Sequence, residues 1–491
     1  MRVAIYHLTA NVISRARGQS MVAAAAYRLG AALRDRRYGV THNYLGKRGV
    51  THAEIMVPAV APDWAHDREA LWNTVEASEL RKDSQLARLI EVGLPIELSA
   101  AERVALVRDY VAEEFVATGM IADFCVRGDP GNPHAHILLT LRALTPTGFG
   151  QKERRWNGKS MLLDWRTAWA ERVNEHLARA GHAARIDHRT LAAQQIELMP
   201  ERRVGIGRAR VGSGALPAHL EERLAEQQRI AKTNVETILE DPTVALRALT
   251  RQRPVFTRRE LADYLRARTQ NTVEFDAVLN AVFQSSELVA LGVVDGQDRF
   301  TSRDMIEAEK SLLRRTASMA GRRGHGVPVD QQNLLSAQCM LRDSARQAFM
   351  CLVSEGDAKA LAVTSQAKPA ILTAAAQAWT GQGLAVRGVA PSRRAAHSLE
   401  AVSGVRSQSL AACEEEWQAD FEMSGDTVLL LDGAEMLGLK QLERVLAVAD
   451  RARAKAVFVG DFDQLYPARA PSPFRDLMRH IPDSVEVSHD R

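Results

Sequence analysis

The stretch at positions 132–142, Asn-Pro-His-Ala-His-Ile-Leu-Leu-Thr-Leu-Arg, constrains the fold more than any other part of the sequence. In a β-strand, side chains two positions apart lie on the same face. One face of this strand therefore carries only apolar side chains, on which helices can pack: Ala135, Ile137, Leu139 and Leu141. The other face carries His134 and His136 side by side, and paired imidazoles suit a divalent cation. Two ligands alone do not define a metal site, so the residues also allow two histidines that bind nothing.

The first 200 residues alternate short strands with helices of unequal length. Strand patterns fit five stretches, at 3–8, 53–57, 89–94, 121–126 and 134–142. Helix patterns fit 23–33, 67–78, a further stretch to about 86, and 99–118. Ser20 suits the N-cap of the first helix. Strands interrupted in this way are typical of an α+β domain with a largely antiparallel sheet.

Composition narrows the class of protein. At 491 residues the chain is too long for one core, so about two to four domains are expected. Its 46% hydrophobic and 25% charged residues are ordinary for a globular protein, and no run approaches the roughly 18 apolar residues of a membrane span. Four scattered cysteines and the lack of a signal-peptide pattern predict a reduced, cytoplasmic protein without membrane insertion. The net charge of +4 permits a nucleic-acid partner without requiring one.

Shifts in composition divide the chain into three domains and two linkers. We expect a first domain at 1–200, a Gly- and Arg-rich linker at 201–216, and a mostly helical region at 217–320 that looks like a winged helix around 257–300. A second linker at 321–330 precedes an Ala-rich α/β domain at 331–491. Its last strand pattern lies close to the end of the chain, which suggests a partial domain. The overall expectation is a multidomain protein with an α+β first domain.

Several N-terminal motifs resemble those of one family. Residues 5–10 read Ile-Tyr-His-Leu-Thr-Ala, and residues 23–28 read Ala-Ala-Ala-Ala-Tyr-Arg, after Gly-Gln-Ser at 18–20. In order and spacing these motifs resemble the opening of the MobA/MobL relaxases, also called the MobQ class. The resemblance continues through 47–50, 71–73, 81–83, 93–95 and 133–140. It therefore covers essentially all of residues 1–170.

The resemblance implies a fold and a reaction. The fold is an HUH-type relaxase domain, in which Tyr27 is the nucleophile and His134 and His136 hold a divalent cation, Mg²⁺ or Mn²⁺. The reaction is a step of conjugative plasmid mobilisation: the enzyme nicks one DNA strand at a transfer origin, forms a 5′-phosphotyrosine, leaves a free 3′-OH and can reseal the nick. A phenol with the ordinary pKa of about 10 needs help from a cation and neighbouring groups. The implied partners are single-stranded and origin plasmid DNA, relaxosome accessory proteins and a type IV secretion coupling protein.

Two positions depart from the family pattern. Relatives carry a third histidine on the strand before the His-x-His turn, where this sequence has Arg127, and a guanidinium cannot ligate a cation. They also carry an acid two positions before Glu91, where this sequence has Leu89, so Glu91 remains as the acidic support. Either Arg127 contacts the phosphate directly or cleavage is weakened. Two functions stay open: a nicking relaxase, or a catalytically weakened origin-binding accessory protein of DNA transfer.

The C-terminal part resembles the first RecA-like domain of the superfamily 1 helicase that is fused to TraA-type relaxases. One matching string is the apolar run 427–431 followed by Asp432-Gly433-Ala434-Glu435-Met436. The other is the apolar run 457–459 followed by Gly-Asp-Phe-Asp-Gln-Leu, which contains Asp461 and Gln464 and looks like helicase motif III.

The nucleotide site of this helicase-like domain lacks several residues that its motifs require. A P-loop needs glycines that let backbone N–H groups close on phosphates, and a hydroxyl residue after its lysine. Here residues 362–372 contain no glycine and are about two residues shorter than the P-loop motif requires. Pro369 follows Lys368, where the motif has a hydroxyl residue. Gly433 and Glu435 have exchanged places relative to the family string, so the carboxylate expected directly after Asp432 is missing. We therefore expect a degenerate domain that binds no ATP, which argues against an ATP-driven helicase.

Overall fold

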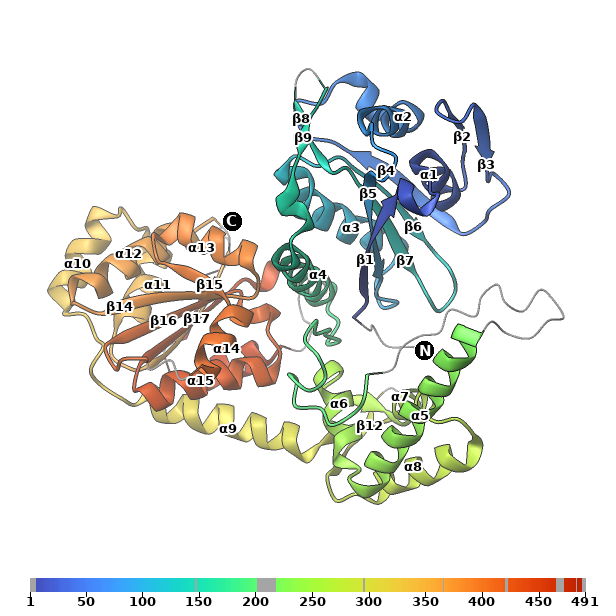
Figure 1. Ribbon diagram of the computed structural model, residues 1–491. Helices are drawn as coiled ribbons and strands as arrows, with labels where there is room; N and C mark the ends of the chain where they lie inside the picture. Colours follow the sequence, from blue (N-terminus) through green and yellow to red (C-terminus); the bar gives the residue numbers. More distant parts are fainter. Residues whose placement is uncertain are drawn as a thin grey trace. The chain divides into compact units, whose positions relative to one another are not determined.

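The computed structural model describes residues 6–145, 148–200, 218–294, 296–364, 366–419, 423–464, 472–482 and 484–487. The chain forms two compact units, drawn in Figure 1. The first comprises Met1–Leu177 with Ile186–His188, and the second comprises Ala178–Arg185 with Arg189–Arg491. The change of unit therefore comes earlier than the predicted boundary at 200. The predicted linker at 201–216 lies outside the described residues.

The first unit is built on a five-stranded sheet with the order β1-β5-β7-β6-β4. Every neighbouring pair is antiparallel, which confirms the predicted antiparallel sheet. The His-x-His segment forms its central strand. In chain order the strands are β1 (Leu8–Ser14), β4 (Val50–Met56), β5 (Gln85–Gly93), β6 (Ala122–Arg127) and β7 (His134–Leu139). Two separate hairpins join β2 (Ala32–Asp35) to β3 (Val40–Asn43), and β8 (Arg142–Thr145) to β9 (Gly148–Lys152).

Helices pack on both faces of this sheet (Figure 1). They are α1 (Met21–Leu29), α2 (Arg68–Ser78), α3 (Ala100–Glu114) and α4 (Lys159–Arg179), with short 3-10 helices at Arg15–Arg17, Asp63–His66, Val116–Thr118 and Arg154–Asn157. The helices α1 and α2 pack on the face that carries Leu89 and its register partner Leu138. On the opposite face, Trp165 of α4 lies against Arg88 of β5. That face also carries the predicted apolar stripe, whose members in β7 are fully buried: Ala135, Ile137 and Leu139.

Three elements of the first unit differ from the prediction. The first strand spans Leu8–Ser14, beyond the predicted 3–8, of which residues 3–5 lie outside the described part. The first helix ends at Leu29, because Gly30 takes the left-handed φ of 64° and caps it. The helix predicted at 67–78 forms as Arg68–Ser78, but the further helix predicted to about residue 86 does not form. The reason is Arg15, whose guanidinium donates to the carbonyl oxygens of Glu79 and Arg81 at 2.6 and 2.7 Å and so holds them in a loop.

The second unit begins with a mainly helical region. Its elements are α5 (Ala218–Glu240), α6 (Thr243–Gln252), β10 (Phe256–Thr257), α7 (Arg258–Arg266), α8 (Thr272–Gln284), β11 (Leu288–Val294), β12 (Gln297–Ser302) and α9 (Arg303–Ala320). The three strands form an antiparallel sheet in the order β10-β12-β11. Two helices thus lie between the first strand and the terminal hairpin, as in a winged helix.

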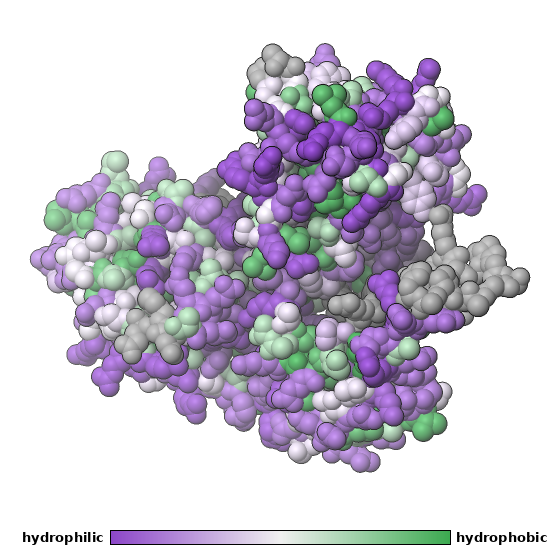
Figure 2. Space-filling view, in the orientation of Figure 1, coloured by the Kyte–Doolittle hydropathy of each residue, from purple (hydrophilic) through white to green (hydrophobic). Residues whose placement is uncertain are grey.

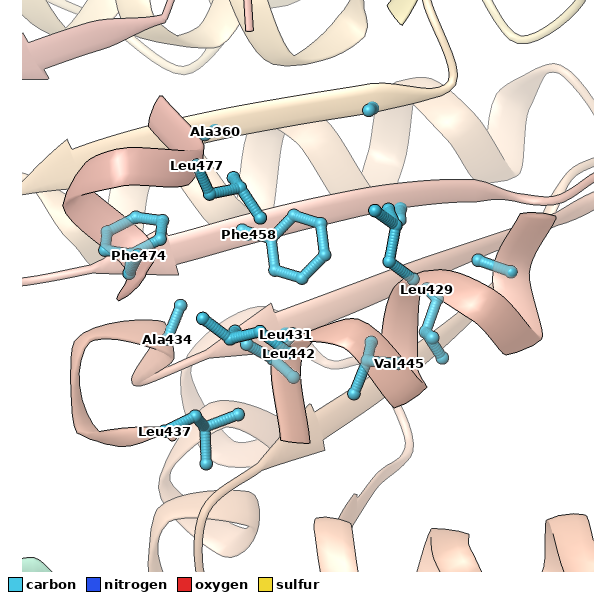
Figure 3. Close-up of a cluster of buried hydrophobic side chains, with 14 of the residues drawn as sticks. Ala360, Leu429, Leu431, Ala434, Leu437, Leu442, Val445, Phe458, Phe474 and Leu477 are labelled. Atoms are coloured by element: carbon cyan, nitrogen blue, oxygen red, sulfur yellow. The ribbon is translucent and has the colours of Figure 1, made fainter. Parts of the chain in front are cut away.

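The rest of the second unit is a six-stranded, wholly parallel sheet with the order β15-β14-β16-β17-β13-β18. Its strands are β13 (Ala358–Val363), β14 (Ala385–Ala390), β15 (Ser407–Ser409), β16 (Thr427–Asp432), β17 (Lys455–Gly460) and β18 (Val485–Val487). The helices are α10 (Val329–Gln338), α11 (Asp343–Val353), α12 (Lys368–Gly381), α13 (Arg393–Ser403), α14 (Leu410–Gln418), α15 (Leu439–Ala452) and α16 (Pro473–His480), with short 3-10 helices at Ala434–Met436 and Phe462–Gln464. Each face of the sheet has its own core. In one, Phe458 of β17 packs near Leu429, Leu431 and Leu477 (Figure 3).

The segment predicted as the second linker, 321–330, packs against this parallel-sheet domain. His325 is buried, and its ring nitrogens lie 2.6 Å from Asp357 Oδ1 and 2.7 Å from the carbonyl oxygen of Gly425. Val327 N–H donates to the carbonyl oxygen of Val353 at 2.9 Å. These bonds fix the path of the segment on the surface of the domain.

No helix within the described ranges is both long and apolar enough to cross a membrane. On the face drawn in Figure 2, hydrophilic residues predominate and hydrophobic ones are scattered among them.

Candidate active site

The histidine pair lies at the start of the central strand β7. His136 is the register partner of Glu91 on β5 and of Cys125 on β6. His134 is the register partner of Arg127 on β6. Directly opposed residues of antiparallel strands point to the same face of a sheet. The two imidazole rings are 5.0 Å apart with an interplanar angle of 80°. The sheet thus brings together both predicted ligands, the predicted acid Glu91 and Arg127, which replaces the third histidine of the family pattern.

Tyr27 lies in the last turn of α1, which packs on that same face of the sheet. The helix begins where Ser20 Oγ accepts a hydrogen bond from the backbone N–H of Ala23 at 3.2 Å, which confirms the predicted N-cap. It ends at the left-handed Gly30. Both ends of the helix are therefore set by local sequence, and they fix the position of Tyr27 along it.

Small residues let α1 approach the strands closely. Ala25 and Ala26 are fully buried and present only methyl groups to the sheet. The thiol of Cys125 donates to the carbonyl oxygen of Arg28 at 3.5 Å, which joins the end of α1 to β6. Because Cys125 is also the register partner of His136, the residues that follow Tyr27 lie next to the histidine pair.

The ring of Tyr27 is held by two side chains from a turn that follows the β2–β3 hairpin. Tyr44 meets it edge-on, with ring centroids 5.3 Å apart. Lys47 Nζ lies 3.5 Å from the centre of the ring and donates to the carbonyl oxygen of Tyr27 at 2.9 Å. The turn is tied to the helix end, since Tyr44 N–H donates to Ala31 O at 3.0 Å. A Cβ on Gly30 would lie 2.9 Å from Lys47 O, so only glycine permits this close approach.

The site is strongly electropositive around His136. Burial, followed by the charges of His134 when it is protonated and of Arg28, Lys47 and Arg127, lowers the pKa of His136 to about 3. His136 is therefore neutral near pH 7, and its lone pair is available to a cation or a hydrogen-bond donor. The same contributions show that side chains from α1, from the turn at 44–47 and from β6 all lie within electrostatic reach of this one imidazole.

The histidine nitrogens are suited to holding a cation, but the set of ligands is short. His136 Nδ1 is buried with no hydrogen-bond partner among the described residues, and Glu91 Oε2 lies 3.7 Å from it. His134 Nδ1 lies 2.9 Å from the carbonyl oxygen of Asn132, which can only accept, so Nδ1 carries the proton and Nε2 the lone pair. Within the described residues no group of three or more His, Cys, Asp or Glu side chains could hold a metal ion. Two imidazoles would therefore bind a divalent cation weakly.

Arg127 occupies the position where a third ligand was expected, and its side chain is held rigidly. Its Nε lies 3.2 Å from Asp129 Oδ2, and its Nη2 donates to the carbonyl oxygen of Arg48 at 3.0 Å. Its Nη1 is buried and has no hydrogen-bond partner in the described part of the chain. One guanidinium N–H group thus stays available next to the histidines.

Leu89, the other departure from the family pattern, serves packing. It is 6% exposed and belongs to the core under α1. Glu91, two residues on, points to the same face and lies beside His136. Of positions 89 and 91, only 91 therefore supplies a carboxylate to the site.

In the helicase-like domain the structure brings Lys368 and Asp432 together. Lys368 begins α12, and its Nζ lies 3.0 Å from both carboxylate oxygens of Asp432 at the end of β16. Only residues 364–367 separate β13 from α12, of which residue 365 lies outside the described part. The ammonium of Lys368 is therefore paired with a carboxylate of its own domain.

Glu435 corrects part of the sequence interpretation. The exchange with Gly433 was expected to remove the carboxylate next to Asp432, but Glu435 is buried on the short helix Ala434–Met436, within electrostatic reach of Asp432 and Lys368. Burial raises the pKa of Glu435 to about 8, so it holds a proton near pH 7. Space for it comes from Gly460, where a Cβ would lie 2.7 Å from Glu435 Oε2.

The two remaining predicted positions follow β17. Asp461 is 3% exposed and accepts a hydrogen bond from the backbone N–H of Asp463 at 3.1 Å. Gln464 ends the short helix Phe462–Gln464, and its side chain lies outside the described part of the structure.

Sequence reasoning missed Lys47 and Arg28 as site residues. Both lie in stretches that carried the family resemblance. Arg28 follows Tyr27 directly, and Lys47 begins the stretch 47–50. Lys47 reaches the site through the turn that returns the chain to α1, and Arg28 reaches it through the contact of α1 with Cys125 on β6. The basic residues between Tyr27 and the strand at Val50–Met56 could have indicated that this segment contributes positive charge to the site.

Comparison with known proteins shows which families the two parts of the chain resemble. The MobA/MobL family model matches residues 19–213, and a model described as an AAA domain matches residues 341–490. Conjugal transfer protein TraA of Rhizobium radiobacter is 34% identical over 98% of this chain and 48% of its own length. Mobilization protein MobL of Acidithiobacillus ferridurans is 36% identical over 48% of this chain and 72% of its own length. Mobilization protein A of Escherichia coli is 33% identical over 40% of this chain and 29% of its own length.

The relatives fall into two groups by how much of the chain they match. The mobilisation proteins align with less than half of the chain, whereas the TraA proteins align along nearly all of it. The chain spans about half the length (48%) of the TraA proteins that it matches. With its N-terminal motifs, its sheet and these relatives in agreement, the chain belongs to the MobA/MobL family of conjugative mobilisation proteins and carries an AAA domain in its second half.

Proposed function

We propose that this protein is a relaxase that uses Tyr27 to cleave and rejoin one DNA strand at the transfer origin of a plasmid. The observation that carries the proposal is the placement of Tyr27: its ring is held by Lys47 and Tyr44 at the end of a helix that lies next to the His134–His136 pair. A tyrosine in this position has what a nucleophile requires, namely a fixed ring and neighbouring positive charge.

In the proposed reaction, the phenolic oxygen of Tyr27 attacks phosphorus and the bond between phosphorus and the 3′ oxygen breaks. The phenol gives up its proton and the departing 3′ oxygen takes one up, so the products are a 5′-phosphotyrosine and a free 3′-OH. The transition state gathers negative charge on the phosphate oxygens. Arg28, Lys47 and Arg127 supply positive charge around that point, since each acts on the same imidazole of His136.

Three groups have more specific roles in this proposal. Arg127 contacts a phosphate oxygen, for which its buried Nη1, without a partner among the described residues, has to become accessible when DNA binds. His134 and His136 would hold a divalent cation, Mg²⁺ or Mn²⁺, which would supply polarisation of the scissile phosphate. Glu91 orients His136. Because the protein offers only two imidazoles, oxygen atoms of the DNA would have to complete the coordination of the cation.

The proposal is tested by incubating the protein with supercoiled plasmid that carries its own origin, in the presence of Mg²⁺ or Mn²⁺. After treatment with detergent and protease, the plasmid should appear as an open circle nicked at one position in one strand. Tyr27→Phe should abolish nicking and leave binding of single-stranded DNA nearly unchanged, since the ring and the basic surface remain. Nicking by the Phe variant would assign the nucleophile to another residue.

A second function remains a candidate because of the missing third ligand. In this alternative the protein binds the origin as an accessory protein and cleaves weakly. It predicts specific origin binding by the wild-type protein, with only a small fraction of the plasmid nicked and attached to protein even at a high metal concentration. The same plasmid assay therefore separates the two functions.

We further propose that the AAA domain of this chain binds no ATP. Lys368 is already paired with Asp432, the preceding loop is short and free of glycine, and Glu435 holds a proton near pH 7. The remaining role of the domain is then to bind DNA or another protein of the transfer machinery, such as a relaxosome accessory protein or a type IV secretion coupling protein.

A further inference from the structure

The β2–β3 hairpin and the turn after it form a basic arm at residues 32–48 that starts and ends beside Tyr27. Four residue pairs align in the hairpin, from Ala32↔Asn43 to Asp35↔Val40, which makes it roughly 13 Å long. It leaves the end of α1 at residue 32, and the chain returns to α1 at Tyr44 and Lys47. Nothing in the proposed reaction explains the outer part of this arm.

The arm carries a charge equal to the formal net charge of the whole protein. It contains one acid, Asp35, and five basic residues: Arg34, Arg36, Arg37, Lys47 and Arg48. The difference is +4, and the net charge of the 491-residue chain is also +4, so all other residues together are neutral in this count. Positive charge is thus concentrated in 17 consecutive residues beside the proposed nucleophile.

The single acid of the arm does not offset this charge at the surface. Asp35 is fully buried, and its carboxylate accepts hydrogen bonds from Ser20 Oγ at 2.5 Å and from the backbone N–H groups of Arg37 and Tyr38 at 3.0 and 3.2 Å. It therefore shapes the turn at 36–39 from the inside. The outer surface of the arm is left to the guanidinium groups.

Those guanidinium groups are exposed and have no carboxylate partner among the described residues: Arg34, Arg36, Arg37 and Arg48. The backbone beneath them is anchored on α2. Asn73 Oδ1 accepts from Arg36 N–H at 2.8 Å, and its Nδ2 donates to Arg34 O at 2.8 Å. A fixed backbone with unpaired cationic side chains is a surface prepared for an anionic polymer.

Two exposed aromatic side chains lie between the two groups of basic residues in the arm. Tyr38 at the tip is 53% exposed and follows Arg36 and Arg37 directly, and Tyr44 at the base is 36% exposed. Aromatic rings on which bases stack, set among cations that meet phosphates, are the pattern of single-stranded nucleic-acid binding. Val40 and Leu45 are exposed in the same stretch, and the exposed arginines lie on both sides of it, at 34–37 and at 48. This concentration of positive charge favours an anionic partner over a purely apolar one.

We propose that the arm binds the single DNA strand next to the bond that Tyr27 cleaves, with its arginines on consecutive phosphates and Tyr38 stacked on a base. This inference rests on the proposed function, because it takes a DNA strand at Tyr27 as its starting point. Contact between Tyr44 and Tyr27 makes the arm continuous with the proposed cleavage site.

The test measures binding of the full-length protein to a fluorescein-labelled oligodeoxythymidine by anisotropy at several salt concentrations. Arg36→Gln combined with Arg37→Gln should weaken binding and reduce the slope of log affinity against log salt by about 1.4, since each phosphate contact on a single strand contributes about 0.7. The matched control combines Arg81→Gln with Lys82→Gln, an exposed basic pair at the far end of β5 from the histidines. This control removes the same charge and should change neither affinity nor slope.

A second pair of variants tests stacking without a change of charge. Tyr38→Ala should weaken binding by roughly 5- to 100-fold, and Tyr38→Phe should keep most of the affinity, because a phenyl ring still stacks. Equal binding by the arm variants and wild type, or equal losses in the arm and control variants, would overturn the arm as the binding surface. A wild-type protein that binds no single-stranded DNA would instead contradict the proposed function itself, and an arm that binds only a protein partner would leave every slope unchanged.

Discussion

Replacement of Lys47 by methionine removes the cation held over the proposed nucleophile and keeps the stem that fills the same space. The ammonium lies 3.5 Å from the centre of the Tyr27 ring and 2.9 Å from its carbonyl oxygen. A cation–π contact at a partly exposed site is worth about 0.5–1 kcal/mol, and a charged hydrogen bond about 1.5–3 kcal/mol. If about 2 kcal/mol of this total orients the ring for attack, the covalent adduct forms about 30-fold more slowly.

The assay is single-turnover formation of the covalent adduct on a saturating origin oligonucleotide, followed on a denaturing gel. Saturation separates the effect on attack from any effect of Lys47 on binding. Lys47→Arg should recover much of the rate because it restores a cation at the end of a long side chain. Lys82→Met is the matched control, since Lys82 is exposed at the opposite end of β5. Equal rates for wild type, Lys47→Met and Lys82→Met would refute the role assigned to Lys47.

Three further predictions concern the remaining parts of the account. Arg127→His should tighten Mn²⁺ binding roughly tenfold in calorimetry, because a third imidazole replaces a nearby positive charge; equal or weaker binding would mean that residue 127 is not at the ligand position. The full-length protein should neither bind nor hydrolyse ATP, and a DNA-stimulated ATPase activity that Lys368→Ala abolishes would contradict this. The pKa of Glu435 is raised to about 8, so its contribution to stability is present below the unfolded pKa of about 4.5 and is lost as the pH rises through 8. Glu435→Gln should therefore gain thermal stability relative to wild type as the pH rises from about 5 to 9, and a difference independent of pH would show that the carboxyl group is not buried.

The sequence predicted best those features that depend on local periodicity. Alternation in β7 placed His134 and His136 on one face and buried Ala135 and Ile137 on the other. Ser20 marked the start of α1 because its side chain satisfies an N–H group of the first turn. The predicted end of the second helix at Ser78 is confirmed. The further helix predicted to about residue 86 was wrong, because Arg15 binds carbonyl groups of that loop from more than 60 residues away, which no local pattern signals.

The site could be predicted only in part, because several of its groups come from chain segments that meet only in the fold. Resemblance supplied Tyr27 and the histidines, but Lys47 joins them through a turn that depends on the left-handed Gly30. In the sequence, the carboxylate that the family has directly after Asp432 is missing, because Gly433 and Glu435 have exchanged places. The short helix after Gly433 returns it to Asp432, and burial rather than absence changes its chemistry.

The most direct test of the central claim is to identify the residue that carries the DNA. The wild-type protein is reacted with an origin oligonucleotide, the adduct is digested with nuclease and trypsin, and the modified peptide is sequenced by mass spectrometry. Trypsin cuts after Arg17 and Arg28, so the account predicts a nucleotide attached to Tyr27 within the peptide at residues 18–28. Attachment to Tyr44 or to any other residue, or origin binding without any adduct, would contradict it.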